Sequence, residues 1–182
     1  MAEDWLDHVT IRLLREEDLP ALEWNGEYTR YRKVYREVYR NSQRGISLPY
    51  VAETPEDGII GQVFLTRKDP NPSYSPRSRY FFLSSFRIKP AFRDLGLGDR
   101  MIRLCFQEVR NHRLRDIFLN CSADNDRARR FYEKHGFRIV RLDEGKWSYV
   151  NHEGLVVSER ESAYLMRRTL PRFFFQVAGG RY

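Results

Sequence analysis

The stretch FFLSSFRIKPAFRDLGLGDRMIRLCFQEVRN, residues 81–111, decides the fold. Its apolar start, Phe81–Ile88, is typical of a strand, which ends at Pro90 because proline has no N–H for the ladder. Apolar residues then recur at helical spacing over Leu97–Val109, after a loop, Arg93–Gly98, that carries two glycines. Unpaired N–H groups and the positive end of the helix dipole meet at such a junction. The sequence therefore predicts a phosphate-binding site there.

Length and composition indicate one domain. The chain has 182 residues, 41% hydrophobic and 31% charged, which predicts a single domain over residues 1–170 and a tail over 171–182. The net charge of +7 comes mainly from arginines spread from Arg12 to Arg181. This charge favours anionic partners in general but names none, and the dispersal does not favour nucleic acid.

The sequence carries no pattern of a membrane protein or of a disulfide or metal protein. No apolar run is long enough for a membrane span, and the acidic stretch Met1–Trp5 is unlike a signal peptide, so we expect a cytoplasmic protein. Cys105 and Cys121 have neither CxxC spacing nor neighbouring histidines. We expect both to be reduced and buried, with no metal site.

The N-terminal half predicts a strand, helices and a hairpin. A strand is expected over residues 8–13, and Asp18 before Leu19-Pro20 marks a helix start. Five aromatic residues at spacings of three or four share one helical face within 22–40, and Gly26 indicates that two helices meet there. They are Trp24, Tyr28, Tyr31, Tyr35 and Tyr39. Residues 48–53 and 59–66 should pair as a hairpin, followed by a proline-rich loop over 67–79.

The C-terminal half predicts further strands around a short helix. Residues 116–121 should form a strand parallel to Phe81–Ile88, because a helix connects the two. A short helix over 127–134, closed by Gly136, is expected next. Three later elements are predicted separately, namely a strand at 137–142, a small hairpin at 146–157 and a last strand at 162–167.

Two spaced motifs resemble the GNAT superfamily of acetyl-coenzyme A-dependent N-acetyltransferases. The first is Arg93-x-x-Gly96-x-Gly98. The second is Asn125-x-x-Ala128-x-x-x-Tyr132-Glu133-Lys134-x-Gly136-Phe137. The resemblance is densest from about 83 to 137. A Rossmann fingerprint is absent, since no third spaced glycine follows, and no Gly-Lys-Ser/Thr of an NTPase loop is present.

The resemblance implies a fold and a coenzyme site. The fold is α/β, a mixed and mostly antiparallel sheet of about seven strands with a splayed central parallel pair, flanked by about four helices. Acetyl-CoA is the implied co-substrate. The implied pyrophosphate contacts are Arg93, Asp94, Leu95, Gly96, Leu97 and Gly98, and the implied pantetheine contacts are Phe86, Arg87, Ile88 and Asn125. Asn125 also fits a plain helix cap, and the two roles are compatible.

The resemblance also implies catalytic groups. Tyr132 matches the family tyrosine near the sulfur, where a protonated phenol can supply a proton to the departing thiolate. The Phe86 N–H is the candidate donor to the thioester oxygen. The strand positions where relatives carry a glutamate base hold Phe82 and Asn120, which cannot act as bases.

Three options therefore remain open for the base. They are a carboxylate near the first helices (Glu23 or Glu27), a water chain, or an amine that arrives neutral. We favour Glu27 acting with water, because that region forms one wall of the acceptor cleft in the family.

Three functions compete at this stage. The leading hypothesis is transfer of acetyl from acetyl-CoA to a primary amine of a small molecule or peptide by direct attack in a ternary complex. An acyl-CoA-binding sensor that has lost turnover and a basic nucleic-acid-binding module are the alternatives. Aromatic residues suit a peptide N-terminus or a small amine, and Glu23, Glu27 and Glu153 suit a polyamine or aminoglycoside. The residues leave open whether the tail docks on the body or on a partner in a homodimer.

Overall fold

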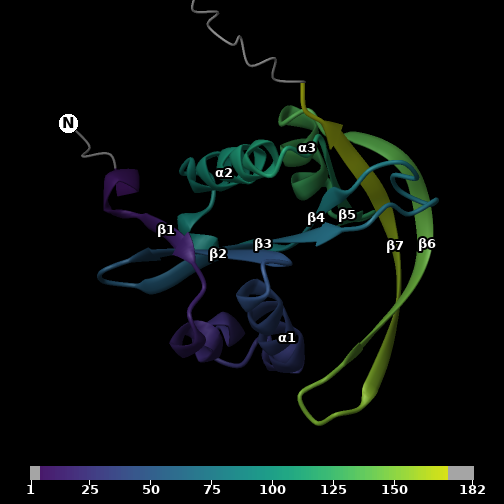
Figure 1. Ribbon diagram of the computed structural model, residues 1–182. Coiled ribbons are helices and arrows are strands. Elements are labelled where there is room, and N and C mark those ends of the chain that lie inside the picture. The colour runs from purple at the N-terminus through teal and green to yellow at the C-terminus, as the bar shows by residue number, and fades with distance from the viewer. Residues whose placement is uncertain (1–4, 172–182) are drawn as a thin grey trace, which may run out of the picture.

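The computed structural model describes residues 5–171, which form one seven-stranded sheet with helices on both faces (Figure 1). The strands lie in the order β1-β2-β3-β4-β5-β7-β6. Their bounds are β1 Thr10–Leu13, β2 Ser47–Thr54, β3 Gly58–Lys68, β4 Tyr80–Ile88, β5 Asp116–Ser122, β6 Arg138–Val150 and β7 Val156–Thr169. The helices are α1 Arg32–Gln43, α2 Leu97–Asn111 and α3 Asp126–Lys134, and short 3-10 segments occur at η1 Trp5–His8, η2 Glu16–Glu23, η3 Thr29–Tyr31 and η4 Pro90–Phe92.

The only parallel pair of the described sheet is β4 with β5, and it separates early. Pairing runs from Phe81 opposite Ile117 to Leu83 opposite Leu119 and stops there, although both strands continue. The register between β3 and β4 shifts at the same level, where Ser85 has a φ of +51°. Such a bulge bends a strand and ends pairing. The predicted mixed sheet with a splayed parallel pair is confirmed.

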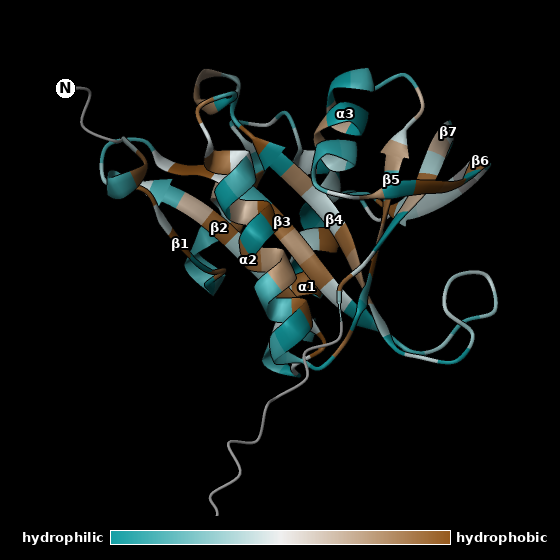
Figure 2. Ribbon diagram, turned by 90° about the horizontal axis from the view of Figure 1, so that it is seen from above, coloured by the Kyte–Doolittle hydropathy of each residue, from teal (hydrophilic) through white to brown (hydrophobic). Residues whose placement is uncertain are grey.

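The two faces of the sheet are covered by different helices (Figure 1). On one face α2 places Met101, Cys105 and Val109 in the main core with strand residues such as Leu65 and Phe81. On the other face Tyr35 of α1 and Leu22 of η2 pack with Val51 and Phe64. Figure 2 shows the apolar strands beneath α2, whose outer surface is hydrophilic. Burial of one apolar face per helix fixes this layered arrangement.

The aromatic stretch at the N-terminus is not the pair of regular helices that its spacing predicts. Trp24, Asn25 and Gly26 have left-handed backbones, with φ of +45°, +57° and +101°. Three successive left-handed residues cannot continue a helix, so only Arg32–Gln43 is α-helical. The prediction of one shared helical face is wrong before residue 29. The rings still gather, with Trp24 and Tyr28 centroids 5.4 Å apart.

The C-terminal strands form one long hairpin, so the prediction of a separate small hairpin at 146–157 is wrong. The register of β6 on β7 runs from Arg138 opposite Arg167 to Val150 opposite Val156. Polar residues interrupt the alternation of apolar residues here because much of the hairpin lies outside the core. The hydrogen bonds between β6 and β7 satisfy its backbone N–H and C=O groups. Figure 1 shows the hairpin bending away from the sheet toward α1.

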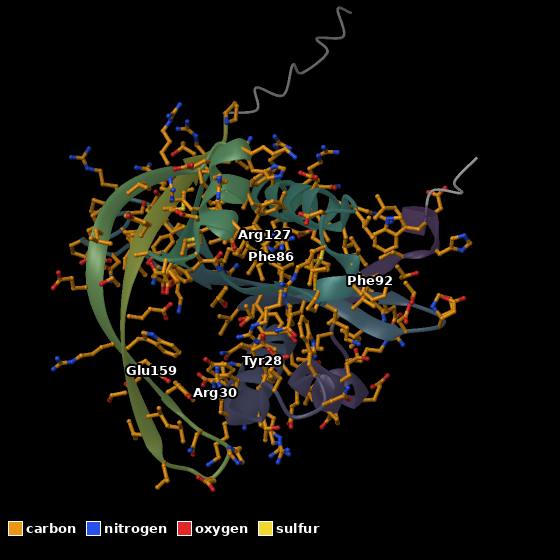
Figure 3. The ribbon with its side chains drawn as sticks, turned by 180° about the vertical axis from the view of Figure 1, so that it is seen from behind. Tyr28, Arg30, Phe86, Phe92, Arg127 and Glu159 are labelled. Carbon is orange, nitrogen blue, oxygen red and sulfur yellow. The ribbon has the colours of Figure 1, made fainter. Side chains whose placement is uncertain are left out.

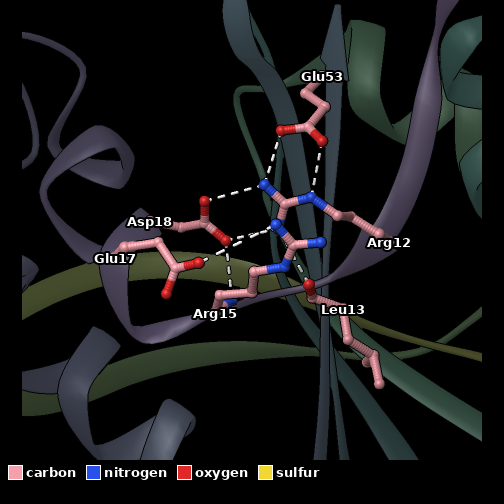
Figure 4. A network of polar contacts seen from close by, with 6 residues as sticks. All are labelled: Arg12, Leu13, Arg15, Glu17, Asp18 and Glu53. Carbon is pink, nitrogen blue, oxygen red and sulfur yellow. Dashed lines mark hydrogen bonds and ion pairs between the residues drawn. The ribbon is translucent and has the colours of Figure 1, made fainter.

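An arginine cluster holds the N-terminal strand in place (Figure 4). Arg12 on β1 donates to both oxygens of Glu53 on β2, at 2.7 and 2.6 Å, and to both oxygens of Asp18 in η2, at 2.6 and 2.9 Å. Asp18 also accepts from the backbone N–H of Arg15 at 2.7 Å. These bidentate contacts tie three elements together.

Other predictions concern cysteines and membrane spans. Cys105 and Cys121 are both free and buried, as expected. No helix in residues 5–171 has the length and hydropathy to cross a bilayer. Beyond Pro171, the predicted tail lies outside the described residues.

Candidate active site

The glycine loop takes a shape that bulky residues would not permit. Gly96 precedes α2 with a φ of +89°, and Asp94 also has a positive φ of +62°. Gly98 has ordinary dihedrals, but a Cβ there would lie 3.1 Å from the ring of Phe131. The first glycine supplies the turn, and the second lets the start of α2 pack closely against Phe131 of α3. Backbone N–H groups at the start of α2 are therefore accessible to a ligand.

A cavity of about 740 Å³ opens where β4 leaves β5, between the glycine loop and α3. The structure places most of the sequence-predicted site residues in its wall. These are Phe86, Arg87, Ile88, Arg93, Asp94, Gly96, Gly98, Asn125 and Tyr132.

Three of the predicted residues are not part of this wall. Leu97 is fully buried in the core, and Leu95 is 48% exposed, with its carbonyl accepting from Trp5 Nε1 at 3.1 Å. Glu27 is exposed. Burial raises the pKa of the Tyr28 hydroxyl, and a hydrogen bond with Glu27 raises it further.

One wall of the cavity is basic and was missed from the sequence. It is the inner face of α3, which contributes Arg127, Arg130, Phe131 and Lys134. Arg130, Phe131 and Lys134 follow Arg127 by three, four and seven residues, so the four share one helical face, which is the signal that could have found them. Arg127 reaches across to Asp94 at 2.7 Å, and Lys134 reaches Asp99 at 3.1 Å.

Tyr132 lines this cavity and lies beside Phe86. Figure 3 labels Phe86 and Arg127, two other residues of the cavity wall. The Tyr132 side chain is 8% exposed, and its ring centroid is 6.4 Å from that of Phe86 and 5.6 Å from that of Phe137. Burial raises the pKa of the Tyr132 hydroxyl well above its usual value, with the nearby Cys121 and Cys105 adding to the shift. The phenol therefore keeps its proton at neutral pH, as an acid must.

Asn125 caps α3. Its Oδ1 accepts from the backbone N–H of Ala128 at 3.0 Å, so the cap predicted from the sequence is confirmed. The same side chain lines the cavity. Its contact with the pantetheine arm stays a prediction.

The cavity reaches a group of aromatic side chains on the α1 face of the sheet. Tyr28 lines it there, and the ring of Tyr31 packs on Tyr149 of β6, with centroids 4.9 Å apart. Figure 3 labels Tyr28 and Arg30 in the region of α1, and Glu159 on β7 of the long hairpin. Glu23 is occupied by Arg32 at 2.5 Å and by Thr29 at 2.9 Å.

The two strand positions that lack a carboxylate have other environments. Phe82 packs against Tyr74 at 6.1 Å between centroids. Asn120 is exposed on β5, opposite Leu165 of β7. Neither side chain can accept a proton from an amine.

Known structures share this arrangement of sheet, loop and helices. Ard1 from Thermoplasma volcanium is 21% identical with a TM-score of 0.65, over 91% of this chain and 99% of that chain. The ribosomal-protein-S18-alanine N-acetyltransferase from Escherichia coli is 17% identical with a TM-score of 0.64, over 94% and 99%. Spermidine N-acetyltransferase from Vibrio cholerae, in complex with CoA and spermine, is 19% identical with a TM-score of 0.59, over 90% and 96%. At these identities the likeness defines the fold, that of N-acetyltransferases.

Sequence comparison gives the family. The profile of the acetyltransferase (GNAT) family matches residues 11–137, well over half of the chain, and the protein belongs to that family. The mycothiol acetyltransferase of Corynebacterium glutamicum (strain R) is 40% identical over 53 residues, or 29% of this chain. That segment spans only 18% of the mycothiol enzyme's length.

Proposed function

We propose that the protein is an N-acetyltransferase that moves acetyl from acetyl-CoA to a primary amine of a small molecule or peptide. The observation that carries the proposal is the cavity that runs from the glycine loop, along the separated end of β4, to Tyr132. The amides beside Gly96 and Gly98 and the basic side chains Arg93, Arg127 and Arg130 suit a diphosphate. The residues present thus fit the coenzyme.

The unpaired edge of β4 receives the pantetheine arm. Residues 86–88 line the cavity and face no strand on the β5 side, so their backbone groups can pair with amides of the arm as an added strand would. Asn125 borders the same passage. This arrangement directs the thioester to the space between Phe86 and Tyr132.

Transfer then needs one bond formed and one broken. The amine nitrogen attacks the thioester carbon, whose oxygen takes a hydrogen bond from the Phe86 N–H, and the carbon–sulfur bond breaks. Tyr132 gives its proton to the sulfur. The amine proton leaves through water toward Glu27, whose carboxylate lies beside Tyr28 at the acceptor end. No covalent enzyme intermediate is required. The acceptors named for the neighbouring structures, an alanine of protein S18 and spermidine, are amines.

A second candidate is an acyl-CoA-binding protein without turnover. It is favoured by Phe82 and Asn120 at the strand positions and by the absence of Glu27 from the cavity wall. Both candidates need coenzyme binding, but only the enzyme releases thiol when an amine is added.

The test measures acetyl-CoA binding by calorimetry and thiol release over a panel of amines and peptides. We expect amine-dependent release, and a Tyr132→Phe variant should lose about 100-fold in kcat with acetyl-CoA binding retained. Because its pKa is raised, Tyr132 should give the wild type no alkaline limb below about pH 10. Binding without any release would favour the sensor, and full activity of the variant would remove Tyr132 as the acid.

A further inference from the structure

Arg87 is a half-buried cation at the acceptor end of the cavity, held by three tyrosines. Its Cζ lies 4.0 Å from the ring centroid of Tyr28 and 5.2 Å from that of Tyr31, and its Nη1 donates to the Tyr35 hydroxyl at 2.7 Å. Within residues 5–171 no carboxylate lies within 4 Å of its nitrogens. A desolvated cation without a counter-ion is costly, so this one is available to an anionic ligand.

Arg12 shows in the same molecule what such a guanidinium can hold. There Nη1 is occupied by Asp18, while Nε and Nη2 donate side by side to the two oxygens of Glu53 at 2.7 and 2.6 Å. In Arg87 Nη1 is likewise occupied, by Tyr35. No side chain or carbonyl of the described chain accepts from its Nε or Nη2. The free pair is the fork that binds a carboxylate in a bidentate manner.

A second buried polar group lies beside this arginine. Gln62 on β3 is directly opposite Arg87 on β4 and is fully buried. It is close enough to Tyr35 to lower the pKa of that hydroxyl, which burial raises overall, yet its Oε1 and Nε2 meet no partner in hydrogen-bonding geometry among the described residues. Buried polar atoms without partners need a reason. A polar ligand or its water at Arg87 and Tyr35 supplies one.

The same contacts argue against a cationic acceptor. The aromatic rings that could enclose an ammonium already hold the guanidinium of Arg87. Of the three carboxylates that suggested a polyamine, Glu23 is paired with Arg32, and neither Glu27 nor Glu153 lines the cavity. Beside Tyr28 the cavity wall therefore carries the positive charge of Arg87 and no glutamate.

We propose that the acceptor is a primary amine that also carries a carboxylate or phosphonate group close to the amine, and that Arg87 binds this group through Nε and Nη2. The inference rests on the proposed acetyl transfer. Arg87 follows Phe86, whose N–H is the donor to the thioester oxygen, so one small acceptor can reach both. A free amino acid and a peptide with an acidic first side chain share this chemistry.

Matched acceptors test the proposal. Each α-amino acid is compared with the amine that lacks its carboxylate, and peptides beginning with Asp are compared with those beginning with Asn. We expect kcat/KM at least 10-fold higher for the anionic member of one series, and the series that responds identifies free amino acids or peptides as the source. Equal rates in both series, or a preference for the uncharged or cationic member, would overturn the proposal.

Variants test the residue. Arg87→Gln should raise the KM for the anionic acceptor by roughly 10- to 100-fold more than it raises the KM for an amine without the anionic group. The KM for acetyl-CoA, measured beside it, reports any effect of the variant on the pantetheine arm. Arg87→Lys should recover part of the loss because it keeps the charge without the fork. Arg30→Gln is the matched control, since Arg30 also packs on Tyr31, at 4.9 Å, but does not line the cavity. An equal loss toward both kinds of acceptor would indicate a structural role only.

The two proposals fail differently. Acetyl-CoA binding without thiol release for any amine would remove the transferase and this inference together. Release that ignores the anionic group would remove only the role of Arg87.

Discussion

At the residue scale, Gly96 and Gly98 are needed for different reasons. Gly96 has a φ of +89°, which side chains with a Cβ rarely adopt, and Gly98 lies where a Cβ would approach the Phe131 ring. Arg93 adds a third constraint, since its Nε donates to the carbonyl of Ile88 at 2.8 Å and fixes the loop against β4. The loop is thus shaped by backbone geometry more than by side-chain chemistry.

This gives a prediction with a matched control. Gly96→Ala should cost about 1 kcal/mol of unfolding free energy and also raise the KM for acetyl-CoA, because the loop amides move. Gly58 has a similar φ of +63° with open space around it, and it is the first residue of β3, directly after the β2–β3 turn, so Gly58→Ala is the control. It should cost similar stability and leave the KM unchanged. Equal KM values for both variants in steady-state assays would contradict a coenzyme role for this loop.

At the element scale, Arg12 joins β1 and η2 to β2, in addition to the β1–β2 ladder and the packing of Leu22 with Val51. Burial by itself would raise the pKa of Asp18, but the hydrogen bonds from Arg12 and from the Arg15 N–H outweigh it and hold the pKa below its usual 3.8. A carboxyl whose pKa is lowered by folding stabilises the native state above its unfolded pKa. That contribution is lost as the pH falls through the lower, folded pKa.

Asp18→Asn should therefore lower the free energy of unfolding at pH 7 by about 2 kcal/mol. The difference from wild type should shrink as the pH drops below 3.8, because Asp18 then gains its proton in the unfolded wild type before it does in the folded protein. Urea unfolding at pH 7 and at pH 3 measures both effects. Glu17→Gln is the control, because Glu17 forms only a surface pair with Arg15 at 4.0 Å and should change stability little. A pH-independent difference would contradict the argument.

At the scale of the whole molecule, the long hairpin of β6 and β7 curves over the α1 face and meets the aromatic residues there. Tyr31 stacks on Trp147 at 6.5 Å and packs at a tilt against Tyr149 at 4.9 Å between centroids. Asn151 stabilises the tip, since its Oδ1 accepts from the N–H groups of Glu153 and Leu155 at 3.0 and 2.9 Å. Segments more than a hundred residues apart in the sequence thus meet on this face of the sheet.

Tyr149→Ala should loosen the contact between the hairpin and Tyr31 and raise the KM for the acceptor several-fold. The KM for acetyl-CoA should stay unchanged because the glycine loop lies on the other face of the sheet. Val156→Ala, at an exposed position of the same hairpin, is the control for a general effect on the ribbon. Two-substrate kinetics separate the two KM values. A change in the acetyl-CoA value alone would place the hairpin outside the acceptor site.

Local residue patterns were enough for much of this protein. Pro90, the glycines at 96 and 98 and the helical periodicity after them determined a strand, a loop and a helix, because each depends on backbone chemistry within a few residues. The two motifs, Arg93–Gly98 and Asn125–Phe137, carried the resemblance to the family, and the resemblance implied the splayed sheet.

Only the tertiary structure decided which side chains meet. The left-handed turn at 24–26 and the continuous hairpin over 138–169 depend on packing between distant segments, which periodicity does not record. The basic face of α3 opposite the loop, and Arg87 enclosed by three tyrosines with its Nε and Nη2 free, exist only because strands and helices from separate parts of the chain converge. Charge and apolar surface act through space, so their partners are fixed by the fold.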